Sequence, residues 1–254
     1  MRLTIKIGSN VLTRKDGSLD VTRMSALVDQ IACLRNEGHE VILVSSGAVA
    51  SGRSELKHIQ HDLDSVDQRQ LFSAVGQAKL INRYFELFRE YGIAVGQVLT
   101  TKENFSDSEH RKNQENCMRV MLENDVLPIV NENDTVSVTE LMFTDNDELS
   151  GLIARMTQSQ VLIILSNIDG IYTGDPSDPA SCLIRTIEPG KDLSDYIQEK
   201  KSSAGRGGMQ SKSNVATQTA AAGISVIIAN GKRENILIKL MNDRGNTPCT
   251  EFIC

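Results

Sequence analysis

The feature that most constrains this fold is an alternation of short apolar runs with longer amphipathic segments. The runs have the length of strands: LTIKI (3–7), VILV (41–44), IAVGQVL (93–99), VLPIV (126–130), VLIIL (161–165) and SVIIA (225–229). Most are continuous and β-branched, which is typical of strands covered on both faces. The sequence therefore predicts an α/β fold, an αβα sandwich with a mainly parallel central sheet.

The segments between these runs have helical spacing. Residues 21–36 place apolar side chains on one face, namely Met24, Leu27, Val28, Ile31 and Leu34. Residues 67–91 carry apolar side chains at helical spacing, namely Leu71, Val75, Ala78, Tyr84, Phe85 and Phe88. Residues 1–254 are expected to form a single domain, with a boundary near 150–160 that divides it into two lobes sharing one sheet.

Composition limits the function classes that fit. A net charge of -6 argues against a general nucleic-acid binder, although a local lysine cluster can hold a small anion on an acidic protein. The five cysteines are scattered and include no C-x-x-C pair, which favours reduced thiols over a zinc site, and we assign no metal ligands. Neither a signal peptide nor a membrane-spanning run is present, so we expect a soluble cytoplasmic protein with no membrane partner.

Two candidate sites follow the first two apolar runs, because open α/β sheets bind ligands beyond the carboxyl ends of their strands. Lys6 lies inside the first run, where it needs either an anionic partner or a path to solvent, and both interpretations stay open. Gly8 would let a backbone N–H approach a phosphate oxygen. The segment VSSGAVASG (44–52) combines small residues with a helix start, which suits an anion or an ordinary serine cap.

The densest polar cluster follows the strand predicted at 126–130. It consists of VNENDTV (130–136) and FTDNDELSG (143–151). The spacing of a calcium loop is not met. Such residues often form turns, but two clusters close to one strand end favour a polar site that binds an amino-acid ammonium or holds lysines in position.

The fourth candidate is GRGGMQSK (205–212), which fits neither the P-loop nor the dinucleotide fingerprint. It is either a flexible linker or a phosphate cradle. If residues 209–222 form a helix, exposed backbone N–H groups, the helix dipole and Lys212 converge at its start. That arrangement favours binding of the β- and γ-phosphates of a nucleotide.

Taken together, these segments resemble the amino-acid kinase superfamily and, within it, the glutamate 5-kinase family. The matching stretches run in family order over nearly the whole chain: KIGSNVLT (6–13), VSSGAVASGR (44–53), LFSAVGQAKL (71–80), YGIAVGQVLT (91–100), LPIVNENDTV (127–136), DNDELS (145–150), NIDGIYTGDP (167–176) and GRGGMQSK (205–212). The combination of NEND, DND and GxGGMxxK is specific, whereas no single stretch is.

The resemblance implies transfer of the ATP γ-phosphoryl group to the side-chain carboxylate of L-glutamate, with Mg²⁺ accompanying the nucleotide. The implied catalytic residues are Lys6, Lys212 and Asp147, whose carboxylate orients the two lysines. The implied glutamate-binding residues are Ser46, Gly47, Asn131, Asp134, Asp145 and Asn146. The implied ATP-binding residues are Lys6, Gly8, Ser166, Asn167, Arg206, Gly207, Gly208, Met209, Gln210, Ser211 and Lys212. Ser166-Asn167 stands where the family usually has Thr-Asp.

The resemblance also implies a glutamate-binding lobe over about residues 1–155 and a nucleotide-binding lobe over about 156–254. Many relatives carry a C-terminal PUA domain, and we expect none here. Proline is the expected feedback inhibitor, and the apolar 67–91 helix favours a homodimer or homotetramer. Two alternatives remain: a related kinase with another acceptor, such as acetylglutamate or uridylate, and a non-catalytic amino-acid sensor. The NEND and DND segments favour a free amino acid, and the presence of both lysines argues against a sensor.

Overall fold

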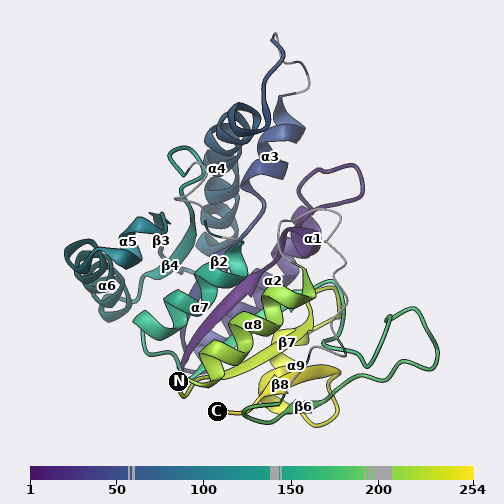
Figure 1. Ribbon diagram of the computed structural model, residues 1–254. Helices are drawn as coiled ribbons and strands as arrows, with labels where there is room; N and C mark the ends of the chain where they lie inside the picture. The colour runs from purple at the N-terminus through teal and green to yellow at the C-terminus, as the bar shows by residue number, and fades with distance from the viewer. Residues whose placement is uncertain are drawn as a thin grey trace.

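A mainly parallel sheet of eight strands forms the centre of the computed structural model (Figure 1). The structure describes residues 1–56, 58, 61–137, 143, 145–191, 193, 196 and 208–254. The strands are β1 (Arg2–Ile7), β2 (Glu40–Ser45), β3 (Val95–Thr100), β4 (Leu127–Glu132), β5 (Val161–Ser166), β6 (Thr186–Ile187), β7 (Ser225–Asn230) and β8 (Cys249–Phe252). Their order is β3-β4-β2-β1-β5-β7-β8-β6, and only β7 and β8 pair antiparallel.

The six apolar runs are the six strands that form the parallel part of the sheet from β3 to β7, as predicted. The αβα fold class is therefore confirmed. The sequence prediction missed β6 and β8. Both are short strands at the far edge of the sheet, and they include polar residues such as Thr186, Thr250 and Glu251, so they lack the continuous apolar signal.

Helices cover both faces of the sheet. They are α1 (Ser9–Leu12), α2 (Val21–Asn36), α3 (Ala48–Glu55), α4 (Ser65–Arg89), α5 (Glu103–Ser106), α6 (Ser108–Glu123), α7 (Asn146–Met156), α8 (Met209–Ala220) and α9 (Ile236–Asn242). One core joins α2, α4 and α9 to one face of the sheet. On the other face α8 packs over β5 and β7, while α6 and α7 pack over β2 and β4, so that α7 and α8 lie in front in Figure 1. None of the described helices combines the length and apolar character needed to cross a bilayer.

The two helical predictions had different outcomes. All five apolar residues assigned to one face of 21–36 are buried in α2. The helix expected over 67–91 is α4, but three of its apolar residues, Leu71, Ala78 and Phe85, are exposed. The buried side instead follows a four-residue spacing, at Phe72, Gly76, Leu80, Tyr84 and Phe88. This stripe includes a glycine, which a search for large apolar residues overlooks.

Gly76 allows α4 to pack directly on the backbone of α3. A Cβ atom at Gly76 would overlap the carbonyl oxygen of Ala48, and one at Gly52 of α3 would overlap the carbonyl of Phe72. We expect Gly76→Ala to lower the free energy of unfolding by about 2 kcal/mol or more, because overpacking forces the two helices apart.

Urea denaturation would measure this effect. Gly245→Ala is the matched control, since nothing lies within 4 Å of a Cβ at that position, and its expected effect is below about 0.5 kcal/mol. Equal stabilities of the two variants would contradict the close helix contact.

Candidate active site

A pocket of about 1070 Å³ lies at the carboxyl ends of β1, β2, β4 and β5. The starts of α1, α3, α7 and α8 also contribute to its walls. The predicted site residues that line it are Lys6, Gly8, Ser46, Gly47, Asn131, Asp134, Asp145, Asn146, Asp147, Ser166, Asn167, Gly208, Met209 and Lys212. Segments far apart in sequence thus meet at one edge of the sheet, as expected for an open α/β fold.

Four predicted residues are not among the lining side chains. Gln210 and Ser211 lie in the first turn of α8, which begins at Met209, close to the predicted start of a helix. Arg206 and Gly207 lie outside the described residues. The predicted phosphate segment is therefore described from Gly208 onward.

Asp147 holds two lysines that come from opposite parts of the chain. Lys6 Nζ in β1 lies 2.6 Å from Asp147 Oδ1, and Lys212 Nζ in α8 lies 2.9 Å from Oδ2. The side chains of Lys6, Asp147 and Lys212 are 5%, 1% and 11% exposed. Of the two interpretations open for Lys6, the structure supports an anionic partner at the pocket wall.

The charge state of Asp147 follows from this pairing. Burial alone would raise the pKa of its carboxyl, but attraction to Lys6 and Lys212 outweighs burial and lowers the pKa to about 2. Asp147 is therefore ionised at neutral pH. With both lysines protonated, the three side chains carry one net positive charge beside the pocket, which suits a phosphate.

Asp145 has a different role at the start of α7. Its Oδ1 accepts hydrogen bonds from the backbone N–H groups of Asp147 and Glu148, at 2.8 and 3.0 Å, and so caps the helix. Burial, followed by the negative charge of Asp147, raises the pKa of this carboxyl. The cap fixes the first turn of α7 and with it the position of Asp147 between the two lysines.

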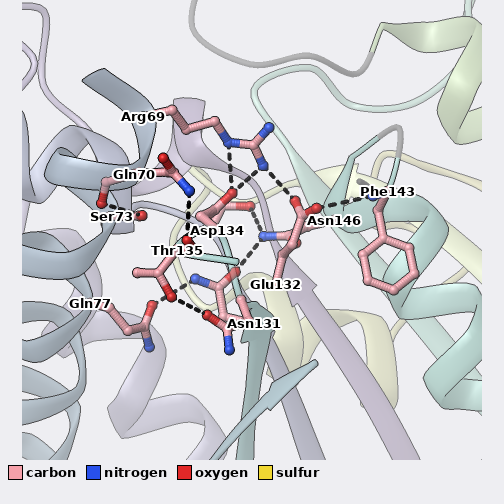
Figure 2. A network of polar contacts seen from close by, with 12 residues as sticks. Arg69, Gln70, Ser73, Gln77, Asn131, Glu132, Asp134, Thr135, Phe143 and Asn146 are labelled. Atoms are coloured by element: carbon pink, nitrogen blue, oxygen red, sulfur yellow. Dashed lines mark hydrogen bonds and ion pairs between the residues drawn. The ribbon is translucent and has the colours of Figure 1, made fainter. Parts of the chain in front are cut away.

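Amide and hydroxyl groups line the neighbouring part of the pocket (Figure 2). Asn146 Nδ2 donates to Ser46 Oγ and to Asn131 Oδ1, both at 2.9 Å. Asn146 Oδ1 is buried and accepts no hydrogen bond from the described residues. Gly47 begins α3 with a positive φ of 111°, a conformation that favours glycine. A buried acceptor beside a helix start suits a ligand with both a donor and an anionic group.

Gly8 follows the last residue of β1 and lies beside the end of β5. Its N–H donates to the carbonyl of Leu165 at 3.1 Å, so this donor is already engaged between β1 and β5. A Cβ atom here would lie 3.2 Å from that carbonyl and 3.5 Å from Lys6 Nζ. The closer of these two contacts is the one to the Leu165 carbonyl, so a side chain at this position would crowd the end of β5.

Sequence reasoning missed two residues of α4 that contact this site. Arg69 Nε donates to Asp134 Oδ1 and its Nη2 to Glu132 Oε2, each at 2.8 Å. Gln77 Oε1 accepts from Asn131 Nδ2 at 2.8 Å. Positions 69 and 77 lie about two helical turns apart and so share a face, a polar signal that an analysis of apolar spacing leaves out.

The chain was compared with known proteins. A model of the amino acid kinase family matches residues 1–230. The chain is 73% identical over 252 residues to the glutamate 5-kinase of Bacteroides thetaiotaomicron, covering 99% of this chain and 70% of that protein. It is 46% identical over 253 residues to the glutamate 5-kinase of Chlorobaculum tepidum, covering 99% of this chain and 69% of that protein.

Solved structures share the fold at low sequence identity. Carbamate kinase from Giardia lamblia, bound to AMP-PNP, aligns with a TM-score of 0.69 at 15% identity, over 99% of this chain and 98% of that one. UMP kinase from Ureaplasma parvum aligns with a TM-score of 0.65 at 15% identity, over 100% and 98% of the two chains. At such identities the likeness concerns the fold alone.

Proposed function

The chain belongs to the glutamate 5-kinase branch of the amino acid kinase family, and we propose that the pocket between Lys6, Asn146 and Lys212 is where it transfers the ATP γ-phosphoryl group to L-glutamate. The acceptor is the side-chain carboxylate, and the product is glutamyl 5-phosphate, the first intermediate of proline biosynthesis. The observation that carries the assignment of the site is the buried Lys6–Asp147–Lys212 group beside the amide-lined part of the pocket.

Electrostatics is the main contribution of these residues to phosphoryl transfer. The reaction brings an anionic acceptor up to an anionic phosphate, so positioning and positive charge account for most of the catalysis. Lys6 and Lys212 supply that charge from two elements, and Asp147 fixes their geometry. No general base is required, because the glutamate side-chain carboxylate is ionised at neutral pH.

The acceptor would bind next to this group, in the lobe formed by about residues 1–155. The buried Asn146 Oδ1 and the Asp134 carboxylate would accept hydrogen bonds from the substrate ammonium. Ser46 and Gly47, at the start of α3, would face the α-carboxylate, because backbone N–H groups at a helix start favour anions.

The nucleotide would bind in the lobe formed by about residues 156–254. Ser166 and Asn167 line its side of the pocket, and Gly208, Met209 and Lys212 line the part where the phosphates would bind. A role of Arg206 and Gly207 in phosphate binding belongs to the same proposal, although both lie outside the described residues. The described residues hold no group of three side chains suited to bind a metal ion. Mg²⁺ would therefore be held mainly by the nucleotide phosphates, where it neutralises their charge.

Three further properties belong to the same proposal. Proline would compete with glutamate as a feedback inhibitor. The chain would assemble as a homodimer or homotetramer through α4, where Phe85 is 51% exposed. The reaction would take place in the cytoplasm, where ATP is available and where the five unpaired cysteines would stay reduced.

One assay tests the function directly. The protein is incubated with ATP and Mg²⁺ and with glutamate, acetylglutamate or UMP, and release of ADP measures turnover with each acceptor. Hydroxylamine then traps the acyl phosphate that forms when the acceptor is a carboxylate. We expect turnover with glutamate and a background rate with the other two. No turnover with glutamate would overturn the proposal. Turnover with another acceptor would indicate a related kinase, and glutamate binding without turnover would indicate a sensor.

A further inference from the structure

Helix α4 is joined to the amide-lined part of the pocket by a chain of side-chain hydrogen bonds (Figure 2). Gln77 Oε1 accepts from Asn131 Nδ2 at 2.8 Å, and Asn131 Oδ1 accepts from Asn146 Nδ2 at 2.9 Å. Asn146 Nδ2 also donates to Ser46 Oγ. These hydrogen bonds thus connect α4 through the end of β4 to the first residue of α7 and the end of β2.

Gln77 lies at one end of this row of hydrogen bonds. An amide side chain has a donor on one side and an acceptor on the other, so the partner at one end decides how it is oriented. Because Gln77 supplies an acceptor, Asn131 turns its nitrogen toward α4 and its oxygen toward Asn146. Asn146 must then donate to Asn131, which leaves its own Oδ1 as the buried atom with no partner among the described residues.

A second polar chain begins at Arg69, two turns before Gln77. Arg69 binds Asp134 through Nε and Nη2, and Glu132 through Nη2. Glu132 Oε1 in turn accepts from the backbone N–H of Phe143 at 3.0 Å. Phe143 is buried and packs edge-on against Phe105, with ring centroids 5.7 Å apart.

This second row of contacts reaches the residues that precede α7. Phe143 lies two positions before Asp145, the cap of that helix. Arg69 therefore fixes two carboxylates that line the pocket, Asp134 and Glu132. Through Glu132 it also holds Phe143, which precedes the cap of α7.

We propose that Gln77 and Arg69 of α4 are positioning residues for the amino-acid substrate: Gln77 orients Asn131 and Asn146, and Arg69 holds Asp134 and Glu132. This inference rests on the proposed function, because it takes the substrate ammonium to bind at Asn146 Oδ1 and Asp134. Neither residue contacts Lys6 or Lys212 in the described interactions, so their removal should affect glutamate binding more than the transfer step.

Kinetics of four variants would test the proposal. Gln77→Met keeps the side-chain length but removes the acceptor. The side-chain amides of Asn131 and Asn146 can then rotate, so that Asn146 presents its nitrogen, a donor, to the substrate ammonium. We expect KM for glutamate to rise about fivefold. Arg69→Met removes charged hydrogen bonds, and we expect a rise of about tenfold or more. KM for ATP and kcat should stay within about threefold of wild type, because the lysine group is untouched.

Conservative variants separate positioning from a general loss of structure. Gln77→Glu retains an oxygen acceptor for Asn131 Nδ2, so its KM for glutamate should return to within about twofold of wild type. Arg69→Lys keeps one charged donor and should recover part of the loss. Arg83→Met is the matched control, since this half-buried arginine of the same helix pairs only with Glu86 in the described interactions, and it should leave both KM values unchanged.

Each outcome bears on one of the two proposals. If the wild-type protein turns over glutamate and both Gln77→Met and Arg69→Met have the wild-type KM for glutamate, the positioning role alone is overturned. The positioning role is also overturned if kcat falls while KM rises for both glutamate and ATP, and if Gln77→Glu shows the same changes as Gln77→Met. A wild-type protein that does not use glutamate overturns the proposed function itself.

Discussion

Lys212→Met is expected to lower kcat for glutamyl phosphate formation by about a thousandfold, while binding of glutamate changes little. Lys212 is one of two buried ammonium groups held by Asp147, at 2.9 Å, beside the pocket. Removing a preorganised charged donor from a transferring group costs about 10²–10³ in rate. The substitution also takes the net charge of the lysine group from positive to neutral. Methionine keeps most of the side-chain volume, so the first turn of α8 should remain folded.

The measurement combines the hydroxylamine assay for kcat with calorimetric titration of L-glutamate for binding. Lys239→Met is the matched control, because Lys239 is an exposed residue of α9 away from the pocket, and its kcat should equal that of wild type. A Lys212→Met protein that keeps more than about a tenth of wild-type kcat would mean that Lys212 does not contact the transferring phosphoryl group.

The sequence was most informative where apolar residues form a continuous run or gather on one face of a helix. Six strands and α2 were predicted because their buried residues are β-branched runs or large side chains at helical spacing. The position of the pocket followed from the same strands, since their carboxyl ends meet at one edge of the sheet. The predicted site residues at these ends therefore line one pocket, with Gln210 and Ser211 as the described exceptions.

What the sequence left undecided depends on contacts between distant segments. The sequence left open whether Lys6 is buried with an anion or reaches solvent. The contact with Asp147, which lies in α7, decides between the two. Arg69 and Gln77 carry no apolar signal, and a polar residue on an amphipathic helix is usually solvated. Their pairing with Glu132 and Asn131 exists only once α4 lies beside the end of β4.

Asp147→Asn is expected to reduce both the rate and the stability of the protein. Its carboxylate is the only anion within 4.0 Å of either lysine in the described part of the chain. Asparagine would leave two buried ammonium groups without a counter-charge, a change that typically costs about 3–5 kcal/mol. Because the lysines then lose their fixed geometry, kcat should also fall by about a hundredfold or more.

The pH dependence gives this prediction its sharpest test. The pKa of Asp147 falls from 3.8 to about 2 on folding, so its contribution to stability is fully present above pH 4 and is lost as the pH falls toward 2. By linkage that contribution is on the order of 2 kcal/mol. The difference in free energy of unfolding between wild type and Asp147→Asn should therefore be constant from pH 7 to 5.

Below pH 4 the same difference should narrow, by about 1 kcal/mol at pH 3, because the wild-type carboxylate begins to be protonated. Urea denaturation at pH 7, 5, 4 and 3 measures it, with Asp62→Asn, an exposed residue before α4, as the control that should match wild type throughout. A difference that stays constant down to pH 3 would mean that Asp147 is not held ionised by the lysines. In that case Lys6 and Lys212 would need another anion to account for their burial.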